Sequence, residues 1–143
     1  MHNKFDIAYL KMATEWATLS YCKRRQVGAL IVKDRMIISD GYNGTPSGFD
    51  NQCEDEEGKT KWHVLHAEAN AILKLARSTN SAEGATLYLT MSPCKECSKL
   101  ILQAGIKKVI YMSNYSDNSG LELLKEANIS ILKINEHDLY KHK

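Results

Sequence analysis

Residues 85–105, ATLYLTMSPCKECSKLILQAG, predict a strand followed directly by a helix. Ala85–Thr90 has the composition of a short strand. Pro93 suits the first turn of a helix, where no backbone amide hydrogen is needed. The helix continues through apolar residues and ends near Gly105, a residue type that commonly terminates helices. A further strand is predicted over Val109–Met112, so this stretch begins a strand–helix–strand unit.

The alternation of strands and helices extends along the chain in both directions. The expected helices are Asp6–Ser20, Leu65–Ala76, Pro93–Gly105 and Leu121–Ala127, and the expected strands are Val27–Val32, Met36–Gly41, Ala85–Thr90, Val109–Met112 and Ile129–Ile134. The first two strands are predicted to form a hairpin, and a long polar loop follows them. We expect a single α/β domain over residues 1–143, with helices covering a sheet. The segment Glu136–Lys143 is expected to be a frayed or partner-docking tail.

Length and charge exclude several classes of protein. The chain has 143 residues, of which 43% are apolar, and this is typical of one folded domain. Its formal charge of +2 argues against a large nucleic-acid interface. No apolar run is long enough to cross a bilayer, and no secretory signal is visible. We therefore expect a cytoplasmic protein whose cysteines are kept reduced.

Cys94 and Cys97 are three residues apart at the start of a predicted helix. A close cysteine pair can bind a metal, perform thiol–disulfide chemistry or simply pack in the core. Residues three apart lie on one helix face, so both thiolates can point at one ion about 2.3 Å from each sulfur. The helix N-terminus also favours the thiolate form. This spacing favours a metal.

Two histidines at the start of another predicted helix can supply nitrogen ligands. His63 and His66 follow the polar loop, whereas three others lie near the termini, where solvated side chains are expected: His2, His137 and His142. His66 as third ligand would leave a fourth position for water, which is the arrangement of catalytic rather than structural zinc. Glu68 lies two residues further on and can accept a proton from that water.

The combination of His66-Ala67-Glu68 and Pro93-Cys94-Lys95-Glu96-Cys97 is similar to the signature of zinc-dependent nucleoside and nucleotide deaminases. Gly41-Tyr42-Asn43-Gly44-Thr45-Pro46 resembles a loop of the deoxycytidylate (dCMP) deaminase branch, and the likeness extends from Phe5 to about Lys133. The resemblance implies a cytidine-deaminase-like α/β/α domain of three layers with a five-stranded mixed sheet. It also implies zinc-dependent hydrolysis of dCMP to dUMP and ammonia, which supplies dUMP for thymidylate synthesis, with Glu68 as the catalytic proton carrier.

The resemblance, together with the residues near the motifs, suggests how substrate is held. Asn43 falls where the family's asparagine contacts the sugar, although Asn-Gly is also a common turn pair. The backbone amide of Ala67 is expected to meet the base. Arg24 and Arg25 are candidates for the 5′-phosphate, with a solvated face or a cation from a neighbouring subunit as alternatives. Tyr115 is expected either to close over the substrate or to pack as an ordinary aromatic residue.

A second metal site and regulation are implied by the same family. Cys22 and Cys53 match positions used by some members for a structural zinc; otherwise they are simple thiols. His63, which is nearby in sequence but does not fall at the family's ligand spacing, is a candidate third ligand, with a carboxylate or another group as the fourth. Family members are commonly hexamers that respond to dCTP and dTTP with Mg²⁺. The loop Tyr42–Gly48 resembles the effector element, so Tyr42, Asn43 and Gly44 are candidate effector contacts.

Three other functions compete with dCMP deamination. A different zinc deaminase, acting on cytidine, guanine or the adenosine of tRNA, would share the zinc ligands. A zinc-stapled binding module without catalysis would have no need of Glu68. A thiol oxidoreductase would form a Cys94–Cys97 disulfide and bind no metal.

Overall fold

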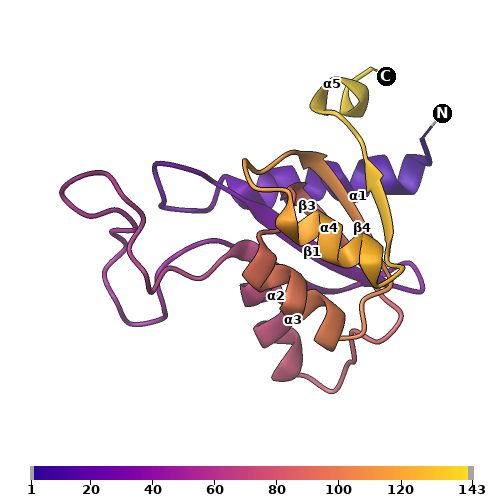
Figure 1. Cartoon of the computed structure of the whole chain (residues 1–143), viewed down its shortest axis with the longest axis horizontal. Coiled ribbons are helices and arrows are strands. Elements are labelled where there is room, and N and C mark those ends of the chain that lie inside the picture. The colour runs from indigo at the N-terminus through magenta and orange to yellow at the C-terminus, as the bar shows by residue number, and fades with distance from the viewer. Residues whose placement is uncertain (1, 142–143) are drawn as a thin grey trace.

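The computed structural model describes residues 2–141, which form a sheet covered by helices on both faces (Figure 1). The elements in chain order are α1 (Lys4–Ala17), β1 (Gly28–Lys33), β2 (Met36–Tyr42), α2 (Ala67–Ala76), β3 (Thr86–Met91), α3 (Lys95–Gln103), β4 (Lys108–Ser113), α4 (Ser119–Glu126), β5 (Ser130–Lys133) and α5 (Glu136–Leu139). Among these residues, no helix combines the length and apolar character needed to cross a membrane.

The sheet has five strands in the order β2-β1-β3-β4-β5. β1 pairs antiparallel with β2 and β3, whereas β3, β4 and β5 run parallel. The hairpin between β1 and β2 turns at Asp34 and Arg35, both with positive φ, as tight hairpin turns require. The five-stranded mixed sheet and its three layers confirm the predicted fold. The carboxyl ends of β3 and β4 lie at one edge, where α/β proteins bind ligands.

Each face of the sheet has its own hydrophobic core. Along β1, Ala29 and Ile31 pack with α2, α3 and α4, while Leu30 and Val32 point to the opposite face with α1 and α5. This alternation follows from the two-residue period of a strand. Because both faces are covered, the central strands are continuous apolar runs rather than alternating ones.

The C-terminal segment is more ordered than the sequence suggested. Glu136–Leu139 forms the short helix α5, and Leu139 is 1% exposed in the core that also contains Leu10 of α1. The prediction of a frayed or partner-docking tail is therefore wrong for residues 136–141, because the segment docks on its own chain. The remainder of that prediction, including His142, lies outside the described residues.

The connection from β2 to α2 folds back on itself instead of extending freely. Gly44 pairs with Leu65, and Glu54 pairs with Thr60, in two isolated antiparallel bridges. In Figure 1 this connection and the α1–β1 loop project from the same end of the sheet. A disulfide joins Cys22 in the α1–β1 loop to Cys53 in the longer one. The two loops thus form one end of the molecule.

Candidate functional site

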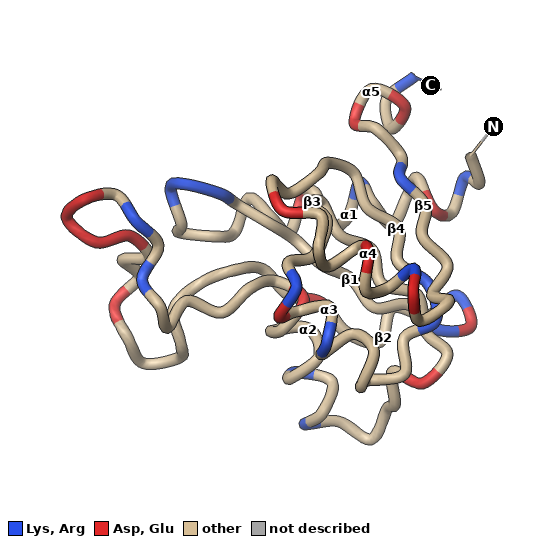
Figure 2. The backbone as a smooth tube through the Cα atoms, viewed as in Figure 1, with Lys and Arg blue, Asp and Glu red and all other residues tan. Residues whose placement is uncertain are grey.

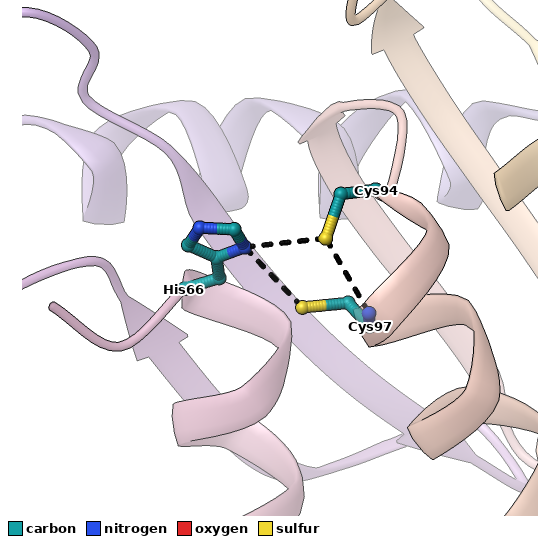
Figure 3. A group of neighbouring side chains, drawn as sticks. All are labelled: His66, Cys94 and Cys97. Atoms are coloured by element: carbon teal, nitrogen blue, oxygen red, sulfur yellow. Dashed lines mark hydrogen bonds between the residues drawn. The ribbon is translucent and has the colours of Figure 1, made fainter. Parts of the chain in front are cut away.

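Two helix N-termini bring three metal-ligand side chains together. His66 is the N-cap residue of α2, and Cys94 is the N-cap residue of α3, whose first turn contains Cys97. The Cys94 sulfur accepts a hydrogen bond from the backbone N–H of Cys97, as an N-cap side chain does. In Figure 3 the imidazole of His66 points at both sulfur atoms. The three predicted zinc ligands therefore meet in one place.

The distances in this group suit a shared zinc ion. The Nδ1 atom of His66 lies 3.5 Å from the Cys94 sulfur and 3.4 Å from the Cys97 sulfur. A tetrahedral ion with Zn–S bonds near 2.3 Å and Zn–N bonds near 2.0 Å holds nitrogen and sulfur roughly 3.5 Å apart. One imidazole and two thiolates are also a donor set that zinc prefers. The residues fit a zinc ion with one position left for another ligand.

The pKa values of the two cysteine thiols shift in opposite directions because the thiols interact with each other. A hydrogen bond from Cys97, aided by His66 and the N–H of Cys97, lowers the pKa of the Cys94 thiol to about 4. The same hydrogen bond and its burial raise the pKa of Cys97. Cys94 is thus a ready thiolate, and metal binding releases the proton of Cys97. No Cys94–Cys97 disulfide is present, unlike the prediction for a thiol oxidoreductase.

Glu68 lies in the first turn of α2, one residue beyond Ala67, and is only 4% exposed. Burial raises its pKa to about 7, although the nearby His66 opposes the shift. A carboxyl group with a pKa near neutrality both accepts and returns protons efficiently. The position and environment of Glu68 therefore suit proton transfer beside the metal ligands.

A cavity of about 280 Å³ opens beside this centre. Its wall includes residues predicted from the sequence, namely Arg24, Arg25, Asn43, His66, Ala67, Glu68, Cys94 and Tyr115. It also includes Glu54, Met91 and Ser92, which the sequence reasoning missed. Ser92 directly precedes the Pro-Cys motif, and this proximity was the signal that could have identified it. The predicted substrate contacts, Glu68 and two of the three predicted metal ligands thus line one cavity.

Asn43 forms part of the cavity wall and also fixes the backbone beside it. Its Oδ1 accepts from the Val27 N–H at 2.9 Å, and its Nδ2 donates to the Arg25 carbonyl at 2.8 Å. The side chain is buried, with 8% exposure. Asn43 therefore holds residues 25–27 in place, a role that neither the turn interpretation nor the sugar-contact prediction included.

Arg25 and Tyr115 pack against each other at the edge of the cavity. The guanidinium carbon of Arg25 lies 4.9 Å from the Tyr115 ring centroid, within the range of a cation–π contact. The backbone N–H of Tyr115 donates to the Ser92 hydroxyl at 2.8 Å. The tyrosine is therefore fixed from the strand β3 side and supports the arginine.

The second predicted metal group differs from its expected composition. Cys22 and Cys53 are joined by a disulfide, and the third side chain within 4.8 Å of both sulfurs is Glu54. His63 instead packs between Phe49 and Trp62, with ring centroids 5.4 and 5.5 Å away. The structure therefore does not bring His63, the predicted third ligand, to this group, and the side chain contacts aromatic neighbours of its own loop instead.

The predicted effector residues take part in contacts that stabilise the β2–α2 connection. The Tyr42 carbonyl accepts a hydrogen bond from the Asn70 side chain at 2.8 Å. Gly44 forms both backbone hydrogen bonds of its bridge with Leu65. These contacts place Tyr42, Asn43 and Gly44 where the hairpin meets the N-terminal end of α2.

Comparison with known proteins identifies relatives along most of the chain. Residues 3–113 match the family model "Cytidine and deoxycytidylate deaminase zinc-binding region". Deoxycytidylate deaminase of Saccharomyces cerevisiae is 36% identical, and the match covers 92% of this chain and 45% of the yeast protein. Deoxycytidylate deaminase of phage T4 is 33% identical, with 85% and 86% covered. The chain thus spans about half the length of the yeast relative and most of the phage one.

Among solved structures, dCMP deaminase of cyanophage S-TIM5, in complex with dCMP and dUMP, is similar with a TM-score of 0.91. It shares 45% sequence identity, and the match covers 94% of this chain and 99% of the cyanophage chain. The matched region of the family model contains all three metal-ligand residues and Glu68. The family model, the relatives and the fold agree, and the chain therefore belongs to the cytidine and deoxycytidylate deaminase family.

Proposed function

We propose that this chain is a zinc-dependent enzyme that hydrolyses dCMP to dUMP and ammonia. The observation that carries the proposal is the buried carboxyl of Glu68 beside a His/Cys/Cys group, in a cavity whose rim also bears Arg24 and Arg25. A purely structural zinc site needs neither a buried carboxylate nor an open cavity. The similar cyanophage enzyme was solved with dCMP and dUMP, which supports the same substrate here.

Zinc held by His66, Cys94 and Cys97 would lower the pKa of a water molecule at its remaining position. Glu68 accepts a proton as the water oxygen attacks the ring carbon that bears the amino group. It passes that proton to the adjacent ring nitrogen and then carries the second water proton to the leaving amine. One carboxylate serves both transfers because each returns it to its starting state. Water is consumed and ammonia leaves, so no oxidant or reductant is required.

The cavity residues divide the remaining work between the parts of the nucleotide. The Ala67 N–H, in the first turn of α2, has no helical acceptor and is available to the base. Asn43 contributes to the sugar region while it holds residues 25–27. Arg24 and Arg25 bind the 5′-phosphate, and Tyr115, which packs against Arg25, covers the substrate beside them.

The test is loss of cytosine absorbance with purified, zinc-loaded protein offered dCMP, CMP, deoxycytidine and cytidine in separate reactions. We expect dCMP to be the fastest substrate by kcat/KM. A preference for cytidine, or no turnover of any of the four, would contradict the proposal. The first result would indicate a different deaminase, and the second a non-catalytic zinc module.

The proposal includes further properties of the family that require their own measurements. The first is a homo-oligomer, expected to be a hexamer, whose mass light scattering measures. The second is regulation by dCTP and dTTP with Mg²⁺ at Tyr42, Asn43 and Gly44. The third is action in the cytoplasm as one deaminase domain over residues 1–143. A second, structural zinc bound by the reduced thiols of Cys22 and Cys53 belongs to the same set. Counting zinc ions per chain under reducing conditions tests it, because one ion contradicts it and two support it.

A further inference from the structure

The basic segment beside the cavity is held from outside by one acidic residue. A single carboxylate oxygen of Glu54, Oε2, accepts hydrogen bonds from the backbone N–H groups of both Lys23 and Arg24, each at 3.1 Å. Glu54 is half-buried and lines the same cavity as the arginines. Figure 2 shows the positive tip of the α1–β1 loop beside the acidic stretch of the β2–α2 connection. A solvated surface run of Lys and Arg has no need of such an anchor.

Other contacts fix the same segment at its far end. The Asn43 amide holds the Arg25 carbonyl and the Val27 N–H, and the ring of Tyr115 supports the Arg25 guanidinium. The Gln26 side chain donates to the Ser20 carbonyl at 2.7 Å. Residues 23–27 are thus anchored at both ends, although the Arg24 and Arg25 side chains are exposed and free to contact a ligand. Only Glu54 anchors the Lys23–Arg24 end through backbone N–H groups among the described contacts.

We propose that Glu54 is a positioning residue that makes the enzyme prefer a phosphorylated substrate over the free nucleoside. This inference rests on the proposed function and names a residue that determines its substrate class. Anchoring the backbone in advance reduces the conformational entropy lost when Arg24 and Arg25 close on an anion. Glu54 acts through hydrogen bonds, because its own negative charge so close to the phosphate would oppose binding.

The hydrogen-bonding role and two other roles of Glu54 make different predictions for its variants. Glutamine keeps an acceptor oxygen at the same reach but carries no charge, and alanine removes both. If Glu54 only repelled the phosphate, Glu54→Gln and Glu54→Ala would both strengthen the preference for dCMP. If Glu54 acted as a metal ligand with Cys22 and Cys53, both variants would reduce the zinc content under reducing conditions.

The experiment measures kcat and KM for dCMP and for deoxycytidine, with zinc content and melting temperature, in three variants. We expect Glu54→Ala to raise KM for dCMP about tenfold, a loss comparable to one or two hydrogen bonds, and to affect deoxycytidine far less. Glu54→Gln should restore most of the dCMP preference. Asp55→Ala is the matched control, since the Asp55 carboxylate also accepts two backbone N–H groups, but those of Glu57 and Lys59 in its own loop rather than those of the basic segment.

A double-mutant cycle shows whether Glu54 acts through the arginines. In a protein with Arg24→Gln and Arg25→Gln, adding Glu54→Ala should cause no further loss of dCMP preference. An additional tenfold loss there, an unchanged substrate ratio in Glu54→Ala, or an equal loss on both substrates would each overturn the inference. Failure of the proposed function looks different, because the unmodified protein would then not turn over dCMP faster than deoxycytidine.

Discussion

Two cysteine-containing clusters flank the cavity, and they are built in different ways. The His66, Cys94 and Cys97 cluster takes its ligands from the N-terminal ends of α2 and α3, which are packed on the sheet. The Cys22, Cys53 and Glu54 cluster connects two loops outside any helix or strand. Ligands on packed helices keep the geometry that a reaction needs, whereas the loop cluster can only hold chain segments together. We infer that the first supplies chemistry and the second supplies the shape of the binding site.

The largest effect that separates the clusters comes from removing a ligand of the first one. Cys97→Ala leaves two ligands, so we expect loss of bound zinc and of all measurable turnover. Cys22→Ala is the control from the second cluster and should retain zinc at the first centre and measurable deamination. Turnover by a zinc-free Cys97→Ala protein would break the distinction between the two clusters.

A smaller effect, confined to catalysis, is expected from Glu68→Gln. The amide cannot carry protons, so kcat should fall by about 10²–10⁴, the usual contribution of a general acid–base residue. Zinc content and melting temperature should stay close to those of the unmodified protein, because Gln fills the same buried volume. Near-normal turnover would sink the role of Glu68 and reduce the first cluster to a structural one.

Cutting the loop tether should affect stability more than chemistry. Cys53→Ala removes the disulfide to Cys22, and we expect the free energy of unfolding to decrease by about 2–4 kcal/mol in oxidising buffer. In reducing buffer and without metal, the unmodified protein should lose a similar amount, since the same cross-link is then absent from both proteins. Urea denaturation in the two buffers measures this, and equal stability of both proteins in oxidising buffer would contradict a stabilising tether.

The smallest effect is expected on the opposite face of the sheet, which serves as a reference for both clusters. The Tyr88 hydroxyl donates to the Asp6 carboxylate at 2.6 Å, and Tyr88→Phe should cost about 1 kcal/mol of stability without changing kcat or KM. Burial raises the pKa of Tyr88, so folding favours its neutral form. The contribution is therefore complete below pH ~10, the ordinary tyrosine pKa, and is lost as the pH rises above it.

Melting curves of Tyr88→Phe and the unmodified protein at pH 8 and above pH 10 should differ less at the higher pH. Tyr9→Phe is a matched control, because the Tyr9 hydroxyl makes only a longer contact, 3.3 Å, to the Arg35 carbonyl. A stability difference that grows with pH would contradict this account of the Tyr88–Asp6 pair.

The first cluster could be predicted from the sequence because its geometry is local. Cys94 and Cys97 are one helical turn apart, and His66 and Glu68 belong to one short motif, so the spacing alone indicates which atoms can share an ion. The strands were equally accessible, since the buried runs of β1 and β3 carry the composition of covered strands. The predicted and observed sheets therefore agree.

Contacts between segments that are far apart in the sequence could not be predicted from residue spacing. Cys22 and Cys53 are 31 residues apart in sequence. They meet only because the β1–β2 hairpin brings the β2–α2 connection back beside the α1–β1 loop. The anchoring role of Glu54 depends on the same encounter. His63 was a candidate metal ligand in the sequence because its contacts with the aromatic rings of Phe49 and Trp62 could not be predicted from residue spacing. Leu139 lies in a tail of polar character, and its burial depends on α1, from the other end of the chain.

The Cys22–Cys53 bond also closes a covalent ring, and the β1–β2 hairpin with Asn43 lies inside it. A protease that cuts the exposed stretch around Asp50 and Asn51 would therefore leave one cross-linked molecule rather than two separate pieces. The wall of the cavity would stay joined to the body of the protein after such a cut. Limited digestion followed by electrophoresis should show an intact band without reductant and two fragments with it.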